Sequence, residues 1–379
     1  MYELHSNFER AKSWLLNSGI CISDPLDKNS GSVHSFYDEK KNEFSFLYPE
    51  ITGYYLSTMR FLFDIEKSNN YLKNGNLTAD WLMQLNTKNN GIIQGIYNSQ
   101  IQNISYSFDT AICAKGILDC FLITNDQKYL QFAKTLILQV EDFLESDGML
   151  KPLKNLSTNQ FEEDSKVWYK QKGCLHVKNC MPFLQLYKIT NDNIFLEKGL
   201  LICDTFSKFQ NGDGSINLHI DDDVINLHTL CYALEGLAYG YHITKNEKYF
   251  ESVKKALAWV IKNIEDDGSI NLWFNSKYNE KAAYPIAQLI RLLILSDKIQ
   301  DNGFLKHAKK LSNFLFSLQN NSENIATSGG FYEGLGKTVF GWKRIPRVNS
   351  WTTMFAIQAI YWLNHHNEYD FDSMIEYLY

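Results

Sequence analysis

The sequence predicts an all-α protein of the (α/α)6 toroid class, in which six helical hairpins form an inner and an outer ring of six helices each. Three observations predict this fold. Loops that contain glycine recur every 54 to 66 residues along the 379-residue chain, at Gly91, Gly148, Gly214, Gly268 and Gly330. Near-identical connectors lie between them, as in ITNDQKYL, ITNDNIFL and ITKNEKYF. Helical patterns fill the remaining chain, and a repeat of this length is typical of stacked supersecondary units.

Twelve stretches carry a helical pattern. They span residues 6–17, 50–66, 69–86, 108–123, 127–145, 174–189, 193–210, 226–243, 246–265, 281–297, 303–319 and 349–365. The even members are more uniformly apolar, as expected of an inner ring that is buried on nearly all sides. The odd members, such as 127–145, carry Lys and Glu on one side, as expected of an outer ring exposed to water. The connectors are rich in Asn and Asp, which end one helix and begin the next.

Residues 1–379 are predicted to form a single domain. Only six prolines occur, and no low-complexity tract marks a linker. Three long irregular segments, 18–48, 151–172 and 320–348, each precede an inner helix. Loops of that length inside a compact domain usually serve a function. We therefore expect these segments to gather on one rim of the ring.

The composition is that of a soluble globular protein, with 45% hydrophobic and 14% aromatic residues, which suits sugar stacking as well as core packing. A net charge of -6 with scattered Lys and Arg gives no footprint for nucleic acid or an anionic membrane. No apolar run is long enough for a membrane span, and the N-terminus lacks the pattern of a signal peptide. Seven cysteines without a CxxC pair indicate a reducing compartment, so a cytoplasmic location is expected.

The stretch 227–241, LHTLCYALEGLAYGY, is almost continuously apolar and predicts a buried helix. It nevertheless carries His228, Tyr232 and Glu235 on one stripe, at helical spacing. A buried ionisable stripe needs partners, water or a ligand, because burying an unpaired charge is costly. We expect the stripe to face a lumen that holds water or a ligand. The alternative is a polar core network in which Arg291 neutralises Glu235 or Asp109.

Polar and aromatic side chains stand at or near the N-terminal end of every expected inner helix. In chain order they are Tyr48, Glu50, Tyr54, Asp109, His176, Lys178, His228, Tyr232, Glu235, Tyr284, Gln288, Arg291 and Trp351. Because consecutive hairpins point the same way, these ends are expected to converge on one rim, where helix dipoles favour anionic groups. One concave polar pocket with aromatic walls is the predicted active site.

Six of these residues are candidate catalytic groups. Glu50, Asp109 and Glu235 are candidate acids or bases, His176 and His228 are alternative proton carriers, and Tyr232 shares their stripe. A structural role stays open for each of them. Glu50 and Asp109 could serve only the first turns of their helices, and His228 could be a hydrogen-bonded core residue.

The remaining candidates would bind the substrate. Lys178 and Arg291 could anchor a substrate carboxylate or phosphate. Sugar stacking or polar contact is expected from Tyr48, Tyr54, Trp273, Tyr284, Gln288, Tyr332, Trp342 and Trp351, for which loop packing is the alternative. The sequence lacks GxSxG, P-loop, GxGxxG, HExxH and paired CxxC patterns, so neither a metal nor another cofactor is expected.

Four segments carry a resemblance to known proteins: YPEITGYY, SFDTA, LHTLCYALEG and the late SGGFY with NSW, spread between Tyr48 and Trp351. The pattern resembles the α/α-toroid superfamilies, terpenoid cyclases and protein prenyltransferases on one side and six-hairpin glycosidase-like enzymes with sugar epimerases on the other. It is most similar to bacterial squalene-cyclase-like proteins encoded with surface-polysaccharide genes. The resemblance implies a toroid fold and a role in polysaccharide biosynthesis.

One departure from that resemblance narrows the chemistry. The DxDDTA motif of the cyclases would fall on 106–111, which reads YSFDTA, and only Asp109 of its three acids remains. Protonation of a terpene is therefore not expected, and the missing zinc-ligand set argues equally against a prenyltransferase.

We therefore expect a carbohydrate-active enzyme of cytoplasmic glycan metabolism that acts on a uronic-acid or amino-sugar unit, free or linked to a nucleotide or lipid. Hydrolysis needs two carboxyl groups across the bond, whereas epimerisation or elimination needs a base and an acid on opposite faces. The sequence leaves both reactions open. A non-catalytic glycan-binding scaffold and, more remotely, prenyl chemistry are the alternatives.

Overall fold

The computed structural model describes residues 2–379, in which the helices match the twelve predicted ones, with one further short helix near the C-terminus. The chain divides into two compact units. The first comprises Met1–Ile20, Phe36–Phe44 and Lys208–Leu378, and the second comprises Cys21–Ser35, Ser45–Ser207 and Tyr379. Each unit contains three helical hairpins. That the chain forms a single domain stays a prediction.

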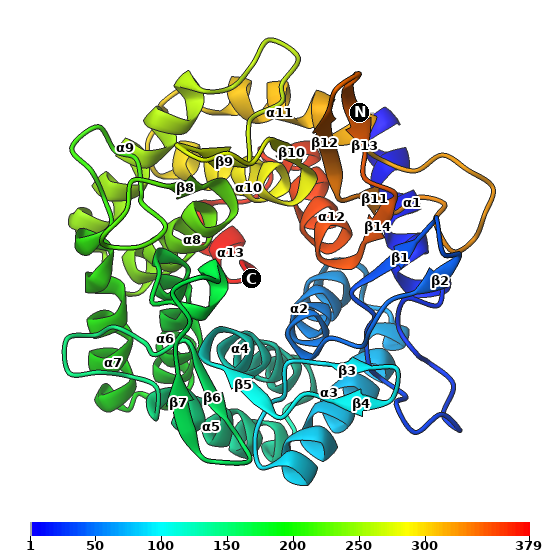
Figure 1. The fold of residues 1–379 in the computed structure, drawn as a ribbon, viewed down its shortest axis with the longest axis vertical. Coiled ribbons are helices and arrows are strands. Elements are labelled where there is room, and N and C mark those ends of the chain that lie inside the picture. The colour runs from blue at the N-terminus through cyan, green and yellow to red at the C-terminus, as the bar shows by residue number, and fades with distance from the viewer. Residues whose placement is uncertain (1) are drawn as a thin grey trace. The chain divides into compact units, whose positions relative to one another are not determined.

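The second unit pairs an apolar helix with a more polar one three times (Figure 1). The pairs are α2 (Pro49–Glu66) with α3 (Asn69–Asn89), α4 (Ser107–Thr124) with α5 (Gln127–Glu141), and α6 (Cys180–Thr190) with α7 (Asn193–Asp204). The 3-10 turns are η1 (Trp168–Lys170), η2 (Cys174–Asn179), which leads into α6, and η3 (Thr205–Lys208). The strands are β3 (Ile96–Tyr97), β4 (Gln100–Ile101), β5 (Ile104–Tyr106), β6 (Leu153–Asn155) and β7 (Gln160–Glu162). They form a β3-β4 ribbon and a β5-β6-β7 sheet, both antiparallel.

The first unit repeats this arrangement. Its pairs are α8 (Leu227–Thr244) with α9 (Glu247–Lys262), α10 (Ala283–Ile299) with α11 (Leu305–Ser317), and α12 (Ser350–Asn364) with α1 (Tyr2–Asn17), and α13 (Phe371–Ile375) packs on α8 and α10. Its strands are β1 (Phe36–Asp38), β2 (Glu43–Phe44), β8 (Ile225–Asn226), β9 (Trp273–Phe274), β10 (Glu280–Ala282), β11 (Phe331–Tyr332), β12 (Gly334–Thr338), β13 (Gly341–Arg344) and β14 (Arg347–Asn349). They form the sheets β11-β14-β1-β2, β10-β12-β13 and β8-β9.

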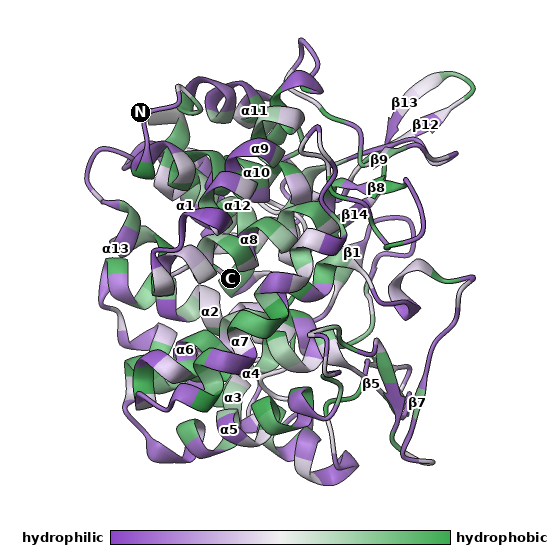
Figure 2. Cartoon of the chain, turned by 90° about the vertical axis from the view of Figure 1, so that its left-hand side faces the viewer, coloured by the Kyte–Doolittle hydropathy of each residue, from purple (hydrophilic) through white to green (hydrophobic). Residues whose placement is uncertain are grey.

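Burial separates the two helices of each pair as the sequence predicts. In α4 every residue from Ser107 to Phe121 is buried, whereas its partner α5 buries only the residues of one face. Hydrophilic colouring marks α5 and α11 in Figure 2. The longest strand of the described chain, β12, has only five residues, so the all-α prediction is confirmed. Within residues 2–379, every helix is too short or too polar to cross a membrane.

The recurring connectors end one helix and begin the next with the same backbone device. Asn125 closes α4 in the left-handed conformation (φ 56°), and Asp126 then accepts a hydrogen bond from the Lys128 amide at 3.0 Å to begin α5. The same pair of roles recurs at Lys67 with Ser68, Asn191 with Asp192, and Lys245 with Asn246. This geometry explains why the connectors are near copies in sequence.

The glycine loops recur because each one packs against the backbone of an outer helix, too closely for a side chain to fit. Gly148 has φ +86°, and a Cβ there would lie 2.3 Å from the carbonyl oxygen of Leu201 in α7. Equivalent contacts join Gly31 to α3, Gly214 to α9, Gly268 to α11 and Gly329 to α1. The glycines that make this contact differ from those that mark the repeat in sequence at two positions. Gly329 takes the place of Gly330, and Gly31 rather than Gly91 makes the contact with α3.

The helices α2 and α4 approach unusually closely through two glycines. A Cβ on Gly116 would lie 2.3 Å from the carbonyl oxygen of Gly53, and one on Gly53 would lie 2.9 Å from that of Ile112. The Cys113 thiol also lies 3.2 Å from the carbonyl oxygen of Pro49. Backbone contact therefore fixes how the first turns of these two helices face each other.

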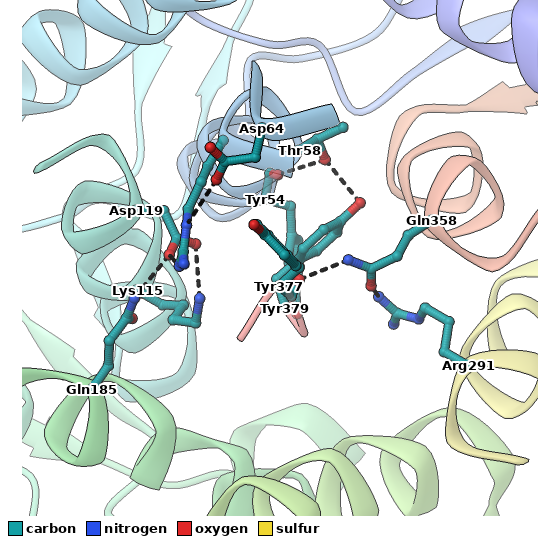
Figure 3. A network of polar contacts seen from close by, with 11 residues as sticks. Tyr54, Thr58, Asp64, Lys115, Asp119, Gln185, Arg291, Gln358, Tyr377 and Tyr379 are labelled. Carbon is teal, nitrogen blue, oxygen red and sulfur yellow. Dashed lines mark hydrogen bonds and ion pairs between the residues drawn. The ribbon is translucent and has the colours of Figure 1, made fainter. Parts of the chain in front are cut away.

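A buried charge cluster in the second unit ties α2, α4 and α6 together (Figure 3). The Asp119 carboxylate accepts hydrogen bonds from Arg60 and Lys115, each at 2.7 Å, and from Gln185 at 2.8 Å. Burial opposes ionisation of Asp119, but the charges of Lys115 and Arg60 outweigh it and lower its pKa. The carboxylate is thus fully engaged by structural partners.

We expect Gly116→Ala to destabilise the protein by about 1–3 kcal/mol, because the added methyl group would clash with the α2 backbone. Gly75→Ala in α3 is the matched control, since a Cβ there meets only the Ile123 side chain at 3.9 Å. Replacing a helical glycine by alanine where space exists should stabilise the protein by roughly 0.5–1 kcal/mol. Denaturant unfolding of both variants checks this, and equal stability would refute the close approach of α2 and α4.

Candidate active site

Two buried carboxyl groups meet at the starts of α2 and α4. Glu50 follows Pro49 in the first turn of α2, and Asp109 lies in the first turn of α4. Burial raises the pKa of Glu50 from 4.5 to about 7. Burial also raises the pKa of Asp109 well above its usual value, and the negative charge of Glu50 raises it further. The pair therefore retains a proton near neutral pH.

The surroundings of the two carboxyl groups push their pKa values apart. Glu50 accepts a hydrogen bond from the Tyr48 hydroxyl and feels the positive charge of Lys178, and both lower its pKa against the effect of burial. The Lys178 ammonium is buried and lies 4.9 Å from the centre of the Tyr54 ring. Within residues 2–379, Asp109 Oδ2 has no hydrogen-bond partner. The contacts of Glu50 thus favour its ionised form, whereas the charge of Glu50 favours the protonated form of Asp109.

Aromatic residues that sequence analysis missed surround Asp109. Burial and the charge of Asp109 raise the pKa of Tyr97 to about 12 and that of Tyr106 further still. The Tyr97 ring stacks on Phe46 with centroids 4.2 Å apart, and the exposed Tyr169 lies 6.2 Å from Tyr106. Tyr106 stands three residues before Asp109 in YSFDTA and could have been inferred. Tyr97 and Tyr169 lie in irregular segments whose pattern carries no such signal.

The first unit holds the second cluster of predicted residues, on α8, α10 and α12. Arg291 donates to Glu235 Oε1 at 2.6 Å and to Gln358 Oε1 at 2.8 Å. Glu235 and Arg291 are both completely inaccessible to solvent. Gln288 donates to the other Glu235 oxygen at 3.2 Å. This arrangement favours the structural alternative for Glu235, which is the neutralisation of Arg291 in a polar core network.

The same network fixes how His228 is protonated. The Glu235 carboxylate only accepts hydrogen bonds, so the Gln288 amide must turn its NH2 group toward it. Gln288 Oε1 then faces His228 Nδ1 at 2.5 Å, and the imidazole must donate there. In its neutral form His228 is thus protonated at Nδ1, and Nε2 is the basic nitrogen.

Aromatic rings flank the His228 imidazole. Its centroid lies 4.1 Å from that of Tyr232 and 4.5 Å from that of Tyr284, and Tyr284 in turn lies 6.0 Å from Trp351. Burial raises the pKa of Tyr284, with a further contribution from the charges of Glu333 and Glu280. The starts of α8, α10 and α12 therefore form a polar centre with aromatic walls.

The other predicted residues have structural partners or lie apart from both clusters. His176 accepts a hydrogen bond from the Gly173 amide at 3.2 Å and closes the η2 turn. The buried Tyr332 donates to Glu39 at 2.7 Å. Trp273 packs on Tyr278 in the loop between β9 and β10. The last predicted residue, Trp342, lies on the β12–β13 hairpin.

The structure thus brings the predicted residues together in two groups, one in each unit. The second unit holds Tyr48, Glu50, Tyr54, Asp109 and Lys178, and the first holds His228, Tyr232, Glu235, Tyr284, Gln288, Arg291 and Trp351, whereas His176, Trp273, Tyr332 and Trp342 lie outside both groups. Convergence of all six helix starts on one rim stays a prediction. Across residues 2–379, no cluster of three or more His, Cys, Asp or Glu residues could hold a metal ion.

The raised pKa of Glu50 predicts a pH-dependent stability. Between pH 4.5 and about 7 the folded protein keeps this proton while the unfolded chain releases it, so the stability that the protonated carboxyl contributes is full at low pH. That contribution should fall by about 3 kcal/mol as the pH rises through this window. Denaturant unfolding of the wild type and Glu50→Gln should show a difference that varies with pH accordingly. A constant difference would contradict the raised pKa.

The buried ion pair predicts that Glu235→Gln destabilises the protein by about 3–5 kcal/mol, because the buried Arg291 loses its counter-charge. Glu251→Gln is the matched control, since Glu251 contacts Lys254 at 2.6 Å but is 47% exposed. Its loss should cost less than about 1 kcal/mol. Thermal unfolding measures both. If Glu235→Gln kept full stability, the structural role of Glu235 would be wrong.

Comparison with known proteins identifies the fold class. No protein-family model matches the chain, and no curated protein matches its sequence. Cellobiose 2-epimerase from Bacillus thermoamylovorans has 14% identity and a TM-score of 0.77, with 95% of this chain and 98% of that chain covered. An unsaturated glucuronyl hydrolase specific for heparin has 12% identity and a TM-score of 0.72, with 97% and 98% covered.

A third structure is an α-1,6-mannanase of Salegentibacter, with 12% identity, a TM-score of 0.64 and coverage of 95% and 99%. That mannanase was crystallised as an inactive variant with two consecutive aspartates replaced by asparagine. These likenesses confirm the predicted all-α (α/α)6 fold class.

Proposed function

We propose that this chain is a carbohydrate-active enzyme that hydrolyses a glycosidic bond, with Asp109 and Glu50 as its acid–base pair. One observation carries the proposal: two buried carboxyl groups share a proton, and their surroundings push their pKa values apart. Such a pair supplies an acid and an ionised partner at the same pH. Glycoside hydrolysis requires this combination.

In the proposed reaction, Asp109 donates its proton to the oxygen that leaves the anomeric carbon as the glycosidic bond breaks. Its Oδ2 atom has no partner within the described residues, so a substrate oxygen can take that place. The ionised Glu50 stabilises the positive charge that develops on the sugar ring. A water molecule then bonds to the anomeric carbon and gives one proton to the Asp109 carboxylate, which leaves a free sugar hydroxyl and restores the acid. Lys178 keeps Glu50 ionised once Asp109 holds the proton.

Similar structures support carboxyl chemistry on a sugar. The heparin-specific glucuronyl hydrolase and the α-1,6-mannanase share this fold, and the mannanase is inactive without two of its aspartates. We propose a uronic-acid or amino-sugar unit as the substrate, free or linked to a nucleotide or lipid. Tyr97, Tyr106 and Tyr169 would provide the apolar faces on which sugars stack.

The cellular setting is also a proposal. All seven cysteines are free, six of them buried, which supports a reducing compartment and hence the cytoplasm. Participation in surface-polysaccharide biosynthesis rests on the sequence resemblance. A glycan-binding scaffold or prenyl chemistry would leave the raised pKa values of Glu50 and Asp109 without a use.

Sugar epimerisation is a second candidate function, and the orientation of His228 favours it. With Nδ1 held by Gln288, Nε2 can take a proton from a carbon next to a carbonyl group. Tyr232 and Tyr284 lie against the same imidazole and could return a proton. Cellobiose 2-epimerase has the same fold.

We expect Asp109→Asn to lower turnover by about a hundredfold or more and to leave the fold intact. The assay uses p-nitrophenyl glycosides and unsaturated uronyl disaccharides, with Asp266→Asn as the control because Asp266 is fully exposed. Wild-type kcat/KM should rise as the pH approaches about 7, where Glu50 ionises. If Asp109→Asn kept its activity, the hydrolase assignment would fall.

An assay with a reducing disaccharide such as cellobiose in D2O separates the two candidates, because such a sugar has a masked carbonyl group. Epimerisation by proton exchange incorporates deuterium at the carbon next to the carbonyl group, whereas hydrolysis does not. Deuterium incorporation that His228→Asn abolishes and Asp109→Asn leaves unchanged would establish the second candidate instead.

A further inference from the structure

The β12–β13 hairpin presents two hydrophobic side chains to solvent. Val339 and Phe340 form its turn and are 94% and 99% exposed, and Trp342 on β13 is 37% exposed. Figure 2 shows the hairpin extending away from α10 and α12, which belong to the same unit. Large apolar side chains this exposed are costly in water, and such features often mark an interaction surface.

The turn is ordered rather than collapsed onto the protein. The Thr338 hydroxyl donates to the Gly341 carbonyl oxygen at 2.8 Å and accepts from the Phe340 amide at 3.2 Å. Gly341 adopts φ +111°, which only glycine readily takes. On β13, Trp342 lies under the ammonium group of Lys337, 4.9 Å from its ring centre. The strands therefore hold the apolar tip in its projecting position.

Cations flank this tip on both strands. Lys337, Lys343 and Arg344 are exposed, and the hydrogen bond from the Lys337 amide to the Asn279 carbonyl oxygen brings the segment of Lys277 and Tyr278 alongside. The nearest acidic residue of this sheet is Glu280 on β10, opposite Gly336. Four exposed cations thus stand on the hairpin and the segment beside it, in a chain whose net charge is -6. The carboxyl groups near them lie toward the base of the sheet, at Glu280, at Glu333 close to it, and at Glu39, which shares Tyr332 with Arg344. The four cations come from two segments that are far apart in the sequence. The cluster therefore cannot be recognised from the sequence alone.

An anionic bilayer surface fits this combination better than other partners. Phe340 and Val339 can enter the interface between headgroups and acyl chains, where Tyr278 and Trp342 would also be favoured. Each Lys or Arg near an anionic surface contributes about 1 kcal/mol of attraction. Two apolar residues are far too few for a stable interface with a second copy, and valine offers no flat face for sugar stacking.

We propose that the β12–β13 hairpin docks this protein on anionic phospholipid membranes, with Val339 and Phe340 inserted and Lys337, Lys343 and Arg344 against the headgroups. This peripheral attachment needs no membrane-spanning helix. It is independent of the hydrolase assignment, because none of these five residues belongs to the carboxyl pair or to the His228 centre. It also revises the expectation, drawn from overall charge, that the protein lacks a footprint for an anionic membrane.

Co-sedimentation with phosphatidylcholine vesicles, with and without phosphatidylglycerol, tests the proposal. The wild type should sediment with the anionic vesicles and remain in solution with the neutral ones, and added salt should weaken the binding. Val339→Ser/Phe340→Ser and Lys337→Glu/Lys343→Glu should each weaken it by at least about tenfold. Circular dichroism and turnover of both variants should match the wild type.

Matched controls separate the hairpin from general surface effects. Leu26→Ser removes another exposed apolar side chain, which is 92% exposed, and Lys88→Glu/Lys306→Glu reverses two exposed lysines outside the hairpin. Both should bind anionic vesicles like the wild type. The proposal fails if the wild type ignores anionic vesicles, or if the control variants lose as much binding as the hairpin variants. It also fails if the hairpin changes only abolish a dimer in sedimentation velocity, since the tip would then contact a second copy.

Discussion

The close contact between α2 and α4 is the constraint on which the carboxyl pair depends. Gly116 brings its backbone against the Gly53 carbonyl group, at a distance that no side chain at position 116 would allow. Glu50 lies one turn before Gly53, and Asp109 lies two turns before Gly116, so the same contact brings two acids close together in a buried place. Burial penalises the charged form of each carboxyl group, and mutual repulsion penalises the second charge. A retained proton is the physical result.

The protein treats its buried carboxyl groups in two opposite ways. Glu235 has a guanidinium partner at 2.6 Å, and Asp119 has both Arg60 and Lys115 at 2.7 Å. Such carboxylates are fully neutralised and hold helices together. Glu50 feels the charge of Lys178, but burial outweighs it and raises the pKa of Glu50, and burial raises the pKa of Asp109 as well. In the hydrolase reaction that we propose, the proton that this pair retains is the one delivered to the substrate.

The sequence predicts the helices well because their signals are local. Apolar periodicity, the left-handed Asn125 and the capping Asp126 all act within a few residues, and the repeats multiply that signal. The site is less predictable because its partners are remote in sequence. Arg291 lies 56 residues from Glu235 in the sequence. The pattern of α8 alone therefore cannot show whether the Glu235 carboxylate contacts a ligand or the Arg291 guanidinium. Tyr97 and Tyr169 lie in irregular segments, and only the tertiary structure brings them near Asp109. No local sequence pattern indicates this position.

Helix α8 shows how depth along a helix separates structural from chemical roles. Glu235 lies two turns inside, where neighbouring helices surround it and a charge survives only with a fixed partner. His228 lies in the first turn, where the inner helices give way to loops, and its ring remains partly exposed. The two residues are nevertheless linked by hydrogen bonds. Glu235 orients the Gln288 amide, and the Gln288 oxygen in turn accepts from the His228 imidazole. The buried ion pair therefore both stabilises the core and decides which nitrogen of His228 faces any sugar that reaches it.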